Sequence, residues 1–211
     1  MNLVERRRNF APGRDVPPPA PPVGRETFPR WVANQERRYE WVEGKIVMMA
    51  DASRGHARIV TNLVVALAAI LDRELYEIAS SDFGVNTPLS RRFPDVLVEP
   101  ASRDGKGRTS ESPIFIAEVM SPSTVTVDRK KKPAEYATLA SLQTYAVFSQ
   151  DEPTVWVWQR SESGLPEKPT RLEGREARLD IPALGTSLPL ADIDRGIGAK
   201  GLSAWPRRPS G

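Results

Sequence analysis

Two short stretches, Pro94-Asp95-Val96-Leu97-Val98 and Ile114-Phe115-Ile116-Ala117-Glu118-Val119, set the architecture, because each reads as a buried strand that carries one carboxylate. A strand covered on both faces is an unbroken apolar run, so an acid within it or at its end requires an explanation. The segment between them contains Asp104-Gly105-Lys106-Gly107, a strong turn signal. If the strands pair antiparallel about this turn, Asp95 and Glu118 fall opposite each other at one open end of a sheet.

Two carboxylates at such a position are close enough to share a divalent cation. Mg²⁺ is usually held by one or two carboxylates together with water and substrate phosphate oxygens. The pair therefore predicts metal-assisted phosphoryl chemistry. The alternative is purely structural: Asp95 caps a turn after Pro94, and Glu118 is a frayed strand end.

Composition narrows the choice of metal and of compartment. The chain of 211 residues has no cysteine and a single histidine, His56. This excludes a disulfide framework, a thiolate zinc site, a cysteine nucleophile and a multi-histidine metal cluster. Oxygen ligands favour Mg²⁺ or Mn²⁺ over Zn²⁺. The net charge of +3 permits a polyanionic partner without requiring one.

Composition also divides the chain into three parts. Residues 1–28 contain the run Val16-Pro17-Pro18-Pro19-Ala20-Pro21-Pro22, which predicts a disordered or polyproline-like tail. Residues 29–195 form one predicted domain, and residues 196–211 are again rich in Gly, Pro and Arg, which predicts a flexible tail. No stretch reads as a signal peptide or a membrane span, so a cytoplasmic location is expected.

The predicted elements give a mixed α/β (α+β) domain, a mixed β-sheet flanked by helices. Helices are expected over 30–38, 56–74 and within 128–140, the second having apolar residues at three- and four-residue spacing. Besides the two acid-bearing strands, strands are expected over 39–42, 46–49, 75–80, 83–87, 144–149 and 155–158, with a further edge strand within 178–184.

The chain resembles a known family at several motifs that occur in the family's order. These motifs are Tyr39-Glu40-Trp41-Val42-Glu43-Gly44-Lys45, Arg92-Phe93-Pro94-Asp95-Val96, Ala117-Glu118-Val119-Met120-Ser121-Pro122-Ser123-Thr124, and Asp128 through Lys132 to Tyr136. They are similar to those of the Uma-two family of bacterial proteins, classed with restriction endonucleases in the PD-(D/E)XK nuclease superfamily. The resemblance covers residues 28–195 and implies a restriction-endonuclease-like fold.

The resemblance also assigns roles to individual residues. Asp95 corresponds to the superfamily's aspartate after proline and Glu118 to the acid of its second motif, so both are expected to bind Mg²⁺ or Mn²⁺. Glu40 matches the glutamate of the Tyr-Glu start and is expected as a third catalytic acid. His56 occupies the position of a histidine often found in the family, and Tyr136 belongs to the lysine-bearing motif.

The catalytic lysine is the one motif that departs from the common pattern. Met120 stands two positions after Glu118, where the superfamily usually has lysine. The family resembles members whose lysine lies on the next helix, which selects Lys132. Pro133 follows it, and proline disfavours the helical conformation in the preceding residue. We therefore expect a helix that begins at Pro133, with Lys132 on the loop before it and Lys130 as the alternative lysine.

Other residues have a structural reading beside the functional one. His56 near a helix start is a candidate cap or packing residue as well as a site residue. Arg91 and Arg92 could contact phosphates or only solubilise a turn. Trp156 and Trp158 alternate with valines, which predicts that one pair faces the core while the other covers an edge or a dimer surface.

Two functions remain open on the sequence. The first is a Mg²⁺-dependent endonuclease that hydrolyses DNA phosphodiester bonds, working as a homodimer because a duplex has two strands to cleave. The second is a catalytically weak or silent nucleic-acid-binding or interaction module on a nuclease scaffold, since fold does not fix function.

Overall fold

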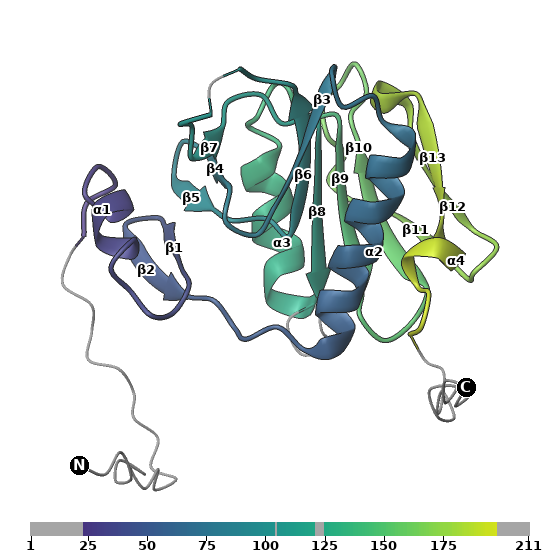
Figure 1. Cartoon of the computed structure of the whole chain (residues 1–211), viewed down its shortest axis with the longest axis horizontal. Helices are drawn as coiled ribbons and strands as arrows, with labels where there is room; N and C mark the ends of the chain where they lie inside the picture. The colour runs from purple at the N-terminus through teal and green to yellow at the C-terminus, as the bar shows by residue number, and fades with distance from the viewer. Residues whose placement is uncertain (1–22, 104, 121–124, 198–211) are drawn as a thin grey trace, which may run out of the picture.

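The computed structural model describes residues 23–103, 105–120 and 125–197, with side chains described throughout these ranges except at 125–130. The mixed α+β architecture predicted from the sequence is confirmed (Figure 1). Six strands form the main sheet in the spatial order β11-β10-β9-β8-β6-β3. Their bounds are β3 Tyr76–Ser80, β6 Val96–Pro100, β8 Phe115–Met120, β9 Thr144–Ser149, β10 Thr154–Gln159 and β11 Thr170–Glu173.

The centre of this sheet is formed by β6, β8 and β9. The β6–β8 pair is antiparallel, as the sequence predicts, with Val96 opposite Ala117 and Leu97 opposite Ile116. The β8–β9 pair is parallel, and the helix α3 (Val125–Tyr136) lies between the two strands in the chain. Two parallel strands need such a crossover, because the chain must return to the end of the sheet at which the first strand began.

Two apolar cores lie on the two faces of the main sheet, because successive strand residues point to opposite faces. On one face, helix α2 (Arg54–Ile70) packs its buried stripe Ile59, Leu63 and Leu67 against the sheet. Helix α4 (Leu190–Ile193), the 3₁₀ turn η1 (Pro182–Leu184) and the hairpin of β12 (Arg178–Ile181) and β13 (Thr186–Pro189) contribute to the same core. Figure 1 shows α2 and α3 on opposite sides of the sheet.

A second sheet of five strands stands beside the main one, in the order β2-β1-β5-β4-β7. Its hairpin turns at Gly44, as predicted, where a φ of +82° suits a residue without a side chain. The strands are β1 Tyr39–Val42, β2 Lys45–Met48, β4 Gly84–Asn86, β5 Ser90–Arg92 and β7 Thr109–Ser110. Strand β7 interrupts the connection between β6 and β8, so that connection is more than the simple turn expected.

Helix boundaries differ from expectation for local reasons. The helix predicted over 30–38 is α1, Phe28–Val32, which ends early because the side chains of Asn34 and Gln35 donate to the carbonyls of Arg30 and Trp31. Helix α2 stops at Ile70, since Leu71 is extended and the Asp72 carboxylate accepts the Glu74 amide in a turn.

The prediction that one side chain pair of β10 covers an exposed edge or dimer surface is wrong. β10 is an inner strand, paired along both edges with β9 and β11. Val155 and Val157 belong to the α2 core, while Trp158 is 1% exposed in the α3 core and Trp156 packs beside it. The predicted strand within 178–184 exists as β12, but it pairs with β13 rather than with the main sheet.

Within the described ranges, no helix is both long and apolar enough to cross a membrane.

Candidate active site

Asp95 and Glu118 meet at one end of the β6–β8 pair. Asp95 comes just before and Glu118 just after the last pair of this register, Val96 with Ala117, so the two acids lie at the same end, close enough for the charge of Asp95 to raise the pKa of Glu118. Both are buried, with 5% and 6% of the residue exposed. Because Glu118 lies within β8 rather than at a loose end, its reading as a frayed strand end is wrong.

The backbone fixes the Asp95 carboxylate. Its Oδ2 accepts a hydrogen bond of 2.8 Å from the Val119 amide of the neighbouring strand. Its Oδ1 lies 3.0 Å from Nε2 of His56. A carboxylate oxygen has more than one lone pair, so each of these oxygens can also contact a cation.

His56 reaches Asp95 from the first turn of α2. The N-cap of the helix is Ser53, whose Oγ accepts a hydrogen bond from the His56 amide. His56 is therefore not the cap, and its imidazole contacts Asp95 instead. The hydrogen bond to Asp95 raises the pKa of His56 above its usual range, against burial, which lowers it. The negative charges of Asp95 and Glu118 add to the rise.

Lys132 and Tyr136 reach Glu118 from α3. The Lys132 Nζ and the Tyr136 hydroxyl each donate to Oε1 of Glu118 at 3.1 Å. Residues four apart share a helix face, which explains why both contact one carboxylate. The Tyr136 ring packs edge-on against Tyr145, which in turn lies against Trp158, with ring centroids 5.1 and 5.2 Å apart.

The expected helix start at Pro133 is wrong, because α3 runs from Val125 to Tyr136 with Pro133 inside it. Lys132 is therefore helical. Proline removes its own amide from the hydrogen-bond pattern and crowds the carbonyl four residues earlier, but the pattern continues where the Ala137 amide donates to the Pro133 carbonyl. The contacts of Lys132 and Tyr136 with Glu118 stabilise the helix in this register. The alternative Lys130 and the motif residue Asp128 belong to α3, but their side chains lie outside the described residues.

Burial raises the pKa of Glu118 to about 7. The positive charge of Lys132 opposes this rise, whereas the charges of Asp95 and Glu40 add to it. Burial also raises the pKa of Tyr136 well above its ordinary value, so the phenol stays protonated and able to donate. A carboxyl that resists ionisation beside a second acid is the usual electrostatic state of a site that gains from a cation.

Glu40 reaches the same region from β1 through a buried ionic chain. The Arg92 guanidinium donates from Nη1 to Glu40 at 2.9 Å, and from Nε and Nη2 to Glu135 of α3 at 2.5–3.2 Å. The second oxygen of Glu40 accepts the Phe93 amide. Burial alone would raise the pKa of Glu135, but the bonds and charge of Arg92 outweigh it and lower that pKa.

The two predicted arginines thus have different surroundings. Arg92 is buried and turned inward, where it connects β1, β5 and α3. Arg91 is half-buried, and its Nε donates to the Asn86 side chain at 2.8 Å.

Several of the residues described so far, but not Arg91, Glu135 or Tyr136, line a cavity of about 380 Å³ at the end of the main sheet. The sequence reasoning missed several of its lining residues, above all Arg38, which adds a positive charge near His56. The sequence signal that could have identified Arg38 is its position directly before Tyr39-Glu40. The charged and polar lining consists of Arg38, Glu40, Asp51, Ser53, His56, Arg92, Asp95, Glu118, Lys132 and Gln150.

The donor set fits Mg²⁺ better than a metal that needs an all-protein shell. Among the residues that the structure describes, no three His, Asp or Glu side chains are grouped closely enough to hold an ion by themselves. Mg²⁺ does not require this, because one or two carboxylates with waters and phosphate oxygens suffice. Asp95 and Glu118 are the two that would hold it. Glu40, whose carboxylate is bonded to Arg92 and Phe93, lies beside them.

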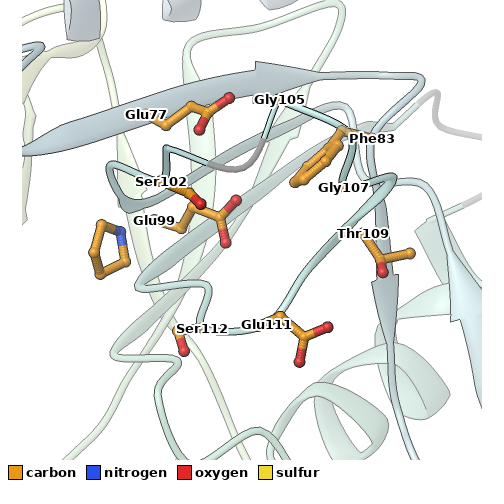
Figure 2. Close-up of a pocket in the computed structure, with 10 residues that line it drawn as sticks. Glu77, Phe83, Glu99, Ser102, Gly105, Gly107, Thr109, Glu111 and Ser112 are labelled. Atoms are coloured by element: carbon orange, nitrogen blue, oxygen red, sulfur yellow. The ribbon is translucent and has the colours of Figure 1, made fainter.

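A second cavity, of about 430 Å³, lies at the other end of β6 (Figure 2). Three glutamates line it, and Glu77 stands directly opposite Glu99 in the β3–β6 pair. The Ser110 hydroxyl donates to Glu99 at 2.5 Å, and Glu111 is the third acid. These negative charges would repel a phosphodiester, so this cavity is not the candidate site.

The mixed α+β fold is of the nuclease-like type. A solved structure described as "a putative nuclease belonging to DUF820", from Anabaena variabilis, has the same fold, with a TM-score of 0.65 and 17% identity. The match covers 80% of this chain and 95% of that one.

The chain belongs to the Uma2 family, the Uma-two family named above. The family model, described as "Putative restriction endonuclease", matches residues 25–191. Two uncharacterized proteins of Synechocystis are similar to the chain. One is 28% identical over 184 residues, which are 85% of this chain and 95% of the relative, and the other is 34% identical over 116 residues, 53% and 66% respectively. Family and fold support a nuclease-like function.

Proposed function

We propose that this chain is a cytoplasmic, Mg²⁺- or Mn²⁺-dependent endonuclease that hydrolyses DNA phosphodiester bonds. The observation that carries the proposal is the convergence of three groups at one sheet end: Asp95 beside Glu118, with the Lys132 ammonium 3.1 Å from the Glu118 carboxylate. Two acids and a lysine on a nuclease-like fold supply the charges that phosphodiester hydrolysis needs.

Each residue has a role that follows from its contacts. A divalent cation held by Asp95 and Glu118 would lower the pKa of a bound water and offset charge on the phosphate. The Lys132 ammonium can donate to a phosphate oxygen or to the attacking water while it stays next to Glu118. His56, with a raised pKa, orients Asp95, and Arg92 holds Glu40 at the cavity wall.

The test is metal binding followed by cleavage. Calorimetric titration of Mn²⁺ should give binding that Asp95→Ala abolishes, and supercoiled plasmid should be nicked only with Mg²⁺ or Mn²⁺ present. Asp95→Ala and Glu118→Ala should each remove cleavage while circular dichroism shows an intact fold. Cleavage that survives both substitutions, or that continues in excess EDTA, contradicts the proposal.

The second candidate is a silent nucleic-acid-binding module on this scaffold. Met120, at the usual lysine position, favours it, whereas the contact of Lys132 with Glu118 weighs against it. Binding of DNA without metal-dependent cleavage would select the module.

A homodimer stays a prediction. β10, which the sequence offered as the dimer surface, is covered on both faces, so the dimer has no assigned surface. A monomer mass by light scattering at tens of micromolar would refute it.

A further inference from the structure

The candidate cavity has two unlike walls. Besides the charged groups, the lining has an apolar part, here called the apolar wall, which comes mainly from the end of β2 and the segment that follows it. Val47 and Met48 are each 42% exposed there. Edge strands usually carry charge or proline instead of bare apolar side chains, so their exposure beside the site requires an explanation. The apolar lining consists of Val47, Met48, Met49, Ala50, Ala52, Val119 and Met120.

A free phosphate or a bare phosphodiester group does not account for this wall. Lys132, His56 and Arg38 are suited to the anion, but an apolar surface contributes binding energy only when it removes another apolar surface from water. The parts of a nucleic acid with apolar surface are the faces of its bases and the carbon atoms of its sugars. In a duplex the base faces are stacked on each other and cannot reach such a wall.

The depth of the carboxylates points in the same direction. Asp95 and Glu118 line the cavity and are almost fully buried. Its volume of about 380 Å³ is in the range of pockets that hold one small ligand, about 300–1,000 Å³. A B-DNA duplex, whose major groove alone is about 12 Å wide, is too large to enter. A nucleotide released from the stack can bring its phosphate down to the carboxylates.

We infer that the site acts on DNA that is unpaired at the point of cleavage, with Val47 and Met48 contacting the face of a base next to the scissile phosphate. Apolar side chains, methionine among them, are known to pack against unstacked base steps. The inference rests on the proposed function, and it names the substrate class of that site. It also removes the need for two active sites in each cleavage event, since one strand is cut at a time.

The first test compares three substrates with the full chain and Mn²⁺: a labelled single strand, the same strand annealed to its complement, and that duplex with a central bulge. Unpairing costs a few kcal/mol, so kcat/KM should be about 10²-fold higher on the single strand and at the bulge than on the perfect duplex. Equal or faster cleavage of the duplex overturns the inference.

A binding measurement separates this inference from the proposed function. Fluorescence anisotropy of the same oligonucleotides, in EDTA so that no cleavage occurs, should show tighter binding of the single strand. If no substrate is cut but this preference remains, the nuclease proposal fails and the assigned ligand stands. Equal affinity for strand and duplex contradicts the inference whether or not the protein cleaves.

The apolar wall is tested by near-isosteric polar substitutions. Val47→Thr and Met48→Gln should each raise KM for the single strand about tenfold with kcat unchanged, because one apolar contact is lost. Val65→Thr is the matched control, since Val65 is 62% exposed on α2 and does not line the cavity. An unchanged KM in both wall variants, with thermal midpoints equal to that of the parent, overturns the role of the wall.

Discussion

Lys131 and Lys132 are adjacent and chemically identical, but their surroundings differ. Lys131 is exposed, whereas the Lys132 side chain is only 12% exposed and bonded to Glu118. Under the proposed function, Lys132→Ala should lower the cleavage rate by about 10²–10⁴-fold, the usual contribution of a positioned acid–base group. Lys131→Ala should stay within a few-fold of the parent. Rates measured on plasmid nicking decide this, and equal losses in both variants would contradict the assignment of Lys132.

The raised pKa of Glu118 has a consequence for stability that can be measured without metal. In the unfolded chain this carboxyl ionises near pH 4.5, and in the folded state near pH 7. Between these values the folded state binds the extra proton, so stability falls as the pH rises. Relative to Glu118→Gln, the free energy of unfolding should decrease by about 3 kcal/mol from pH 4.5 to 7 and stay level above. Urea titrations in EDTA at several pH values measure it; a difference that does not vary with pH contradicts the shift.

At the scale of elements, the ionic chain Glu40–Arg92–Glu135 connects β1, β5 and the lysine-bearing helix α3. Removing one partner of a buried ion pair leaves an uncompensated charge. Arg92→Met should therefore lower the free energy of unfolding by about 3–5 kcal/mol. Arg91→Met, at the half-buried neighbour, should cost about 1.5 kcal/mol or less. Urea unfolding of both variants tests the difference. Similar losses in the two variants would show that the ionic contacts of Arg92 with Glu40 and Glu135 contribute little to stability.

At this scale the sequence could predict features that are fixed by residues close together in the chain, but not features that depend on contacts between distant segments. The closeness of Asp95 and Glu118 was predictable, because each acid lies at the same end of one of two apolar strands that are joined by a turn signal. The inward turn of Arg92 was not, because its partner Glu135 is 43 positions away and either arginine of the pair suits a surface turn equally well. Pro133 misled because local preference was outweighed by the contacts of Lys132 and Tyr136 with Glu118.

At the scale of the whole molecule, the main sheet is stabilised by a separate core on each face. Leu63 of α2 is fully buried in one of them, and Val65 on the same helix is exposed. Leu63→Ala should cost about 2–5 kcal/mol of unfolding free energy, while Val65→Ala should change it by no more than about 0.5 kcal/mol. Chemical denaturation measures both. A small loss for Leu63→Ala would mean that neighbouring side chains on this face move in to fill the space left by the shortened side chain.

The two-core arrangement also marks where whole-molecule prediction from sequence stopped. Alternation along residues 155–158 correctly separates Val155 and Val157 from the tryptophans. Alternation cannot say what covers the second face, and only the return of α3 over the sheet shows that Trp158 is internal. The second sheet, the partner of β12 and the burial of Arg92 arise in the same way, from contacts between segments far apart in the chain.

The aromatic contacts behind the site have a practical consequence. The Tyr136 hydroxyl donates to Glu118, and the Tyr136 ring packs against Tyr145, which packs against Trp158. The first of these three contacting chromophores is therefore one hydrogen bond away from a carboxylate that is proposed to bind metal. Rigid rings in close contact give near-ultraviolet circular dichroism that is sensitive to their orientation and electric field. Mg²⁺ is itself optically silent. The protein therefore carries an intrinsic spectroscopic reporter, by which the arrival of a colourless ion could be followed without a label.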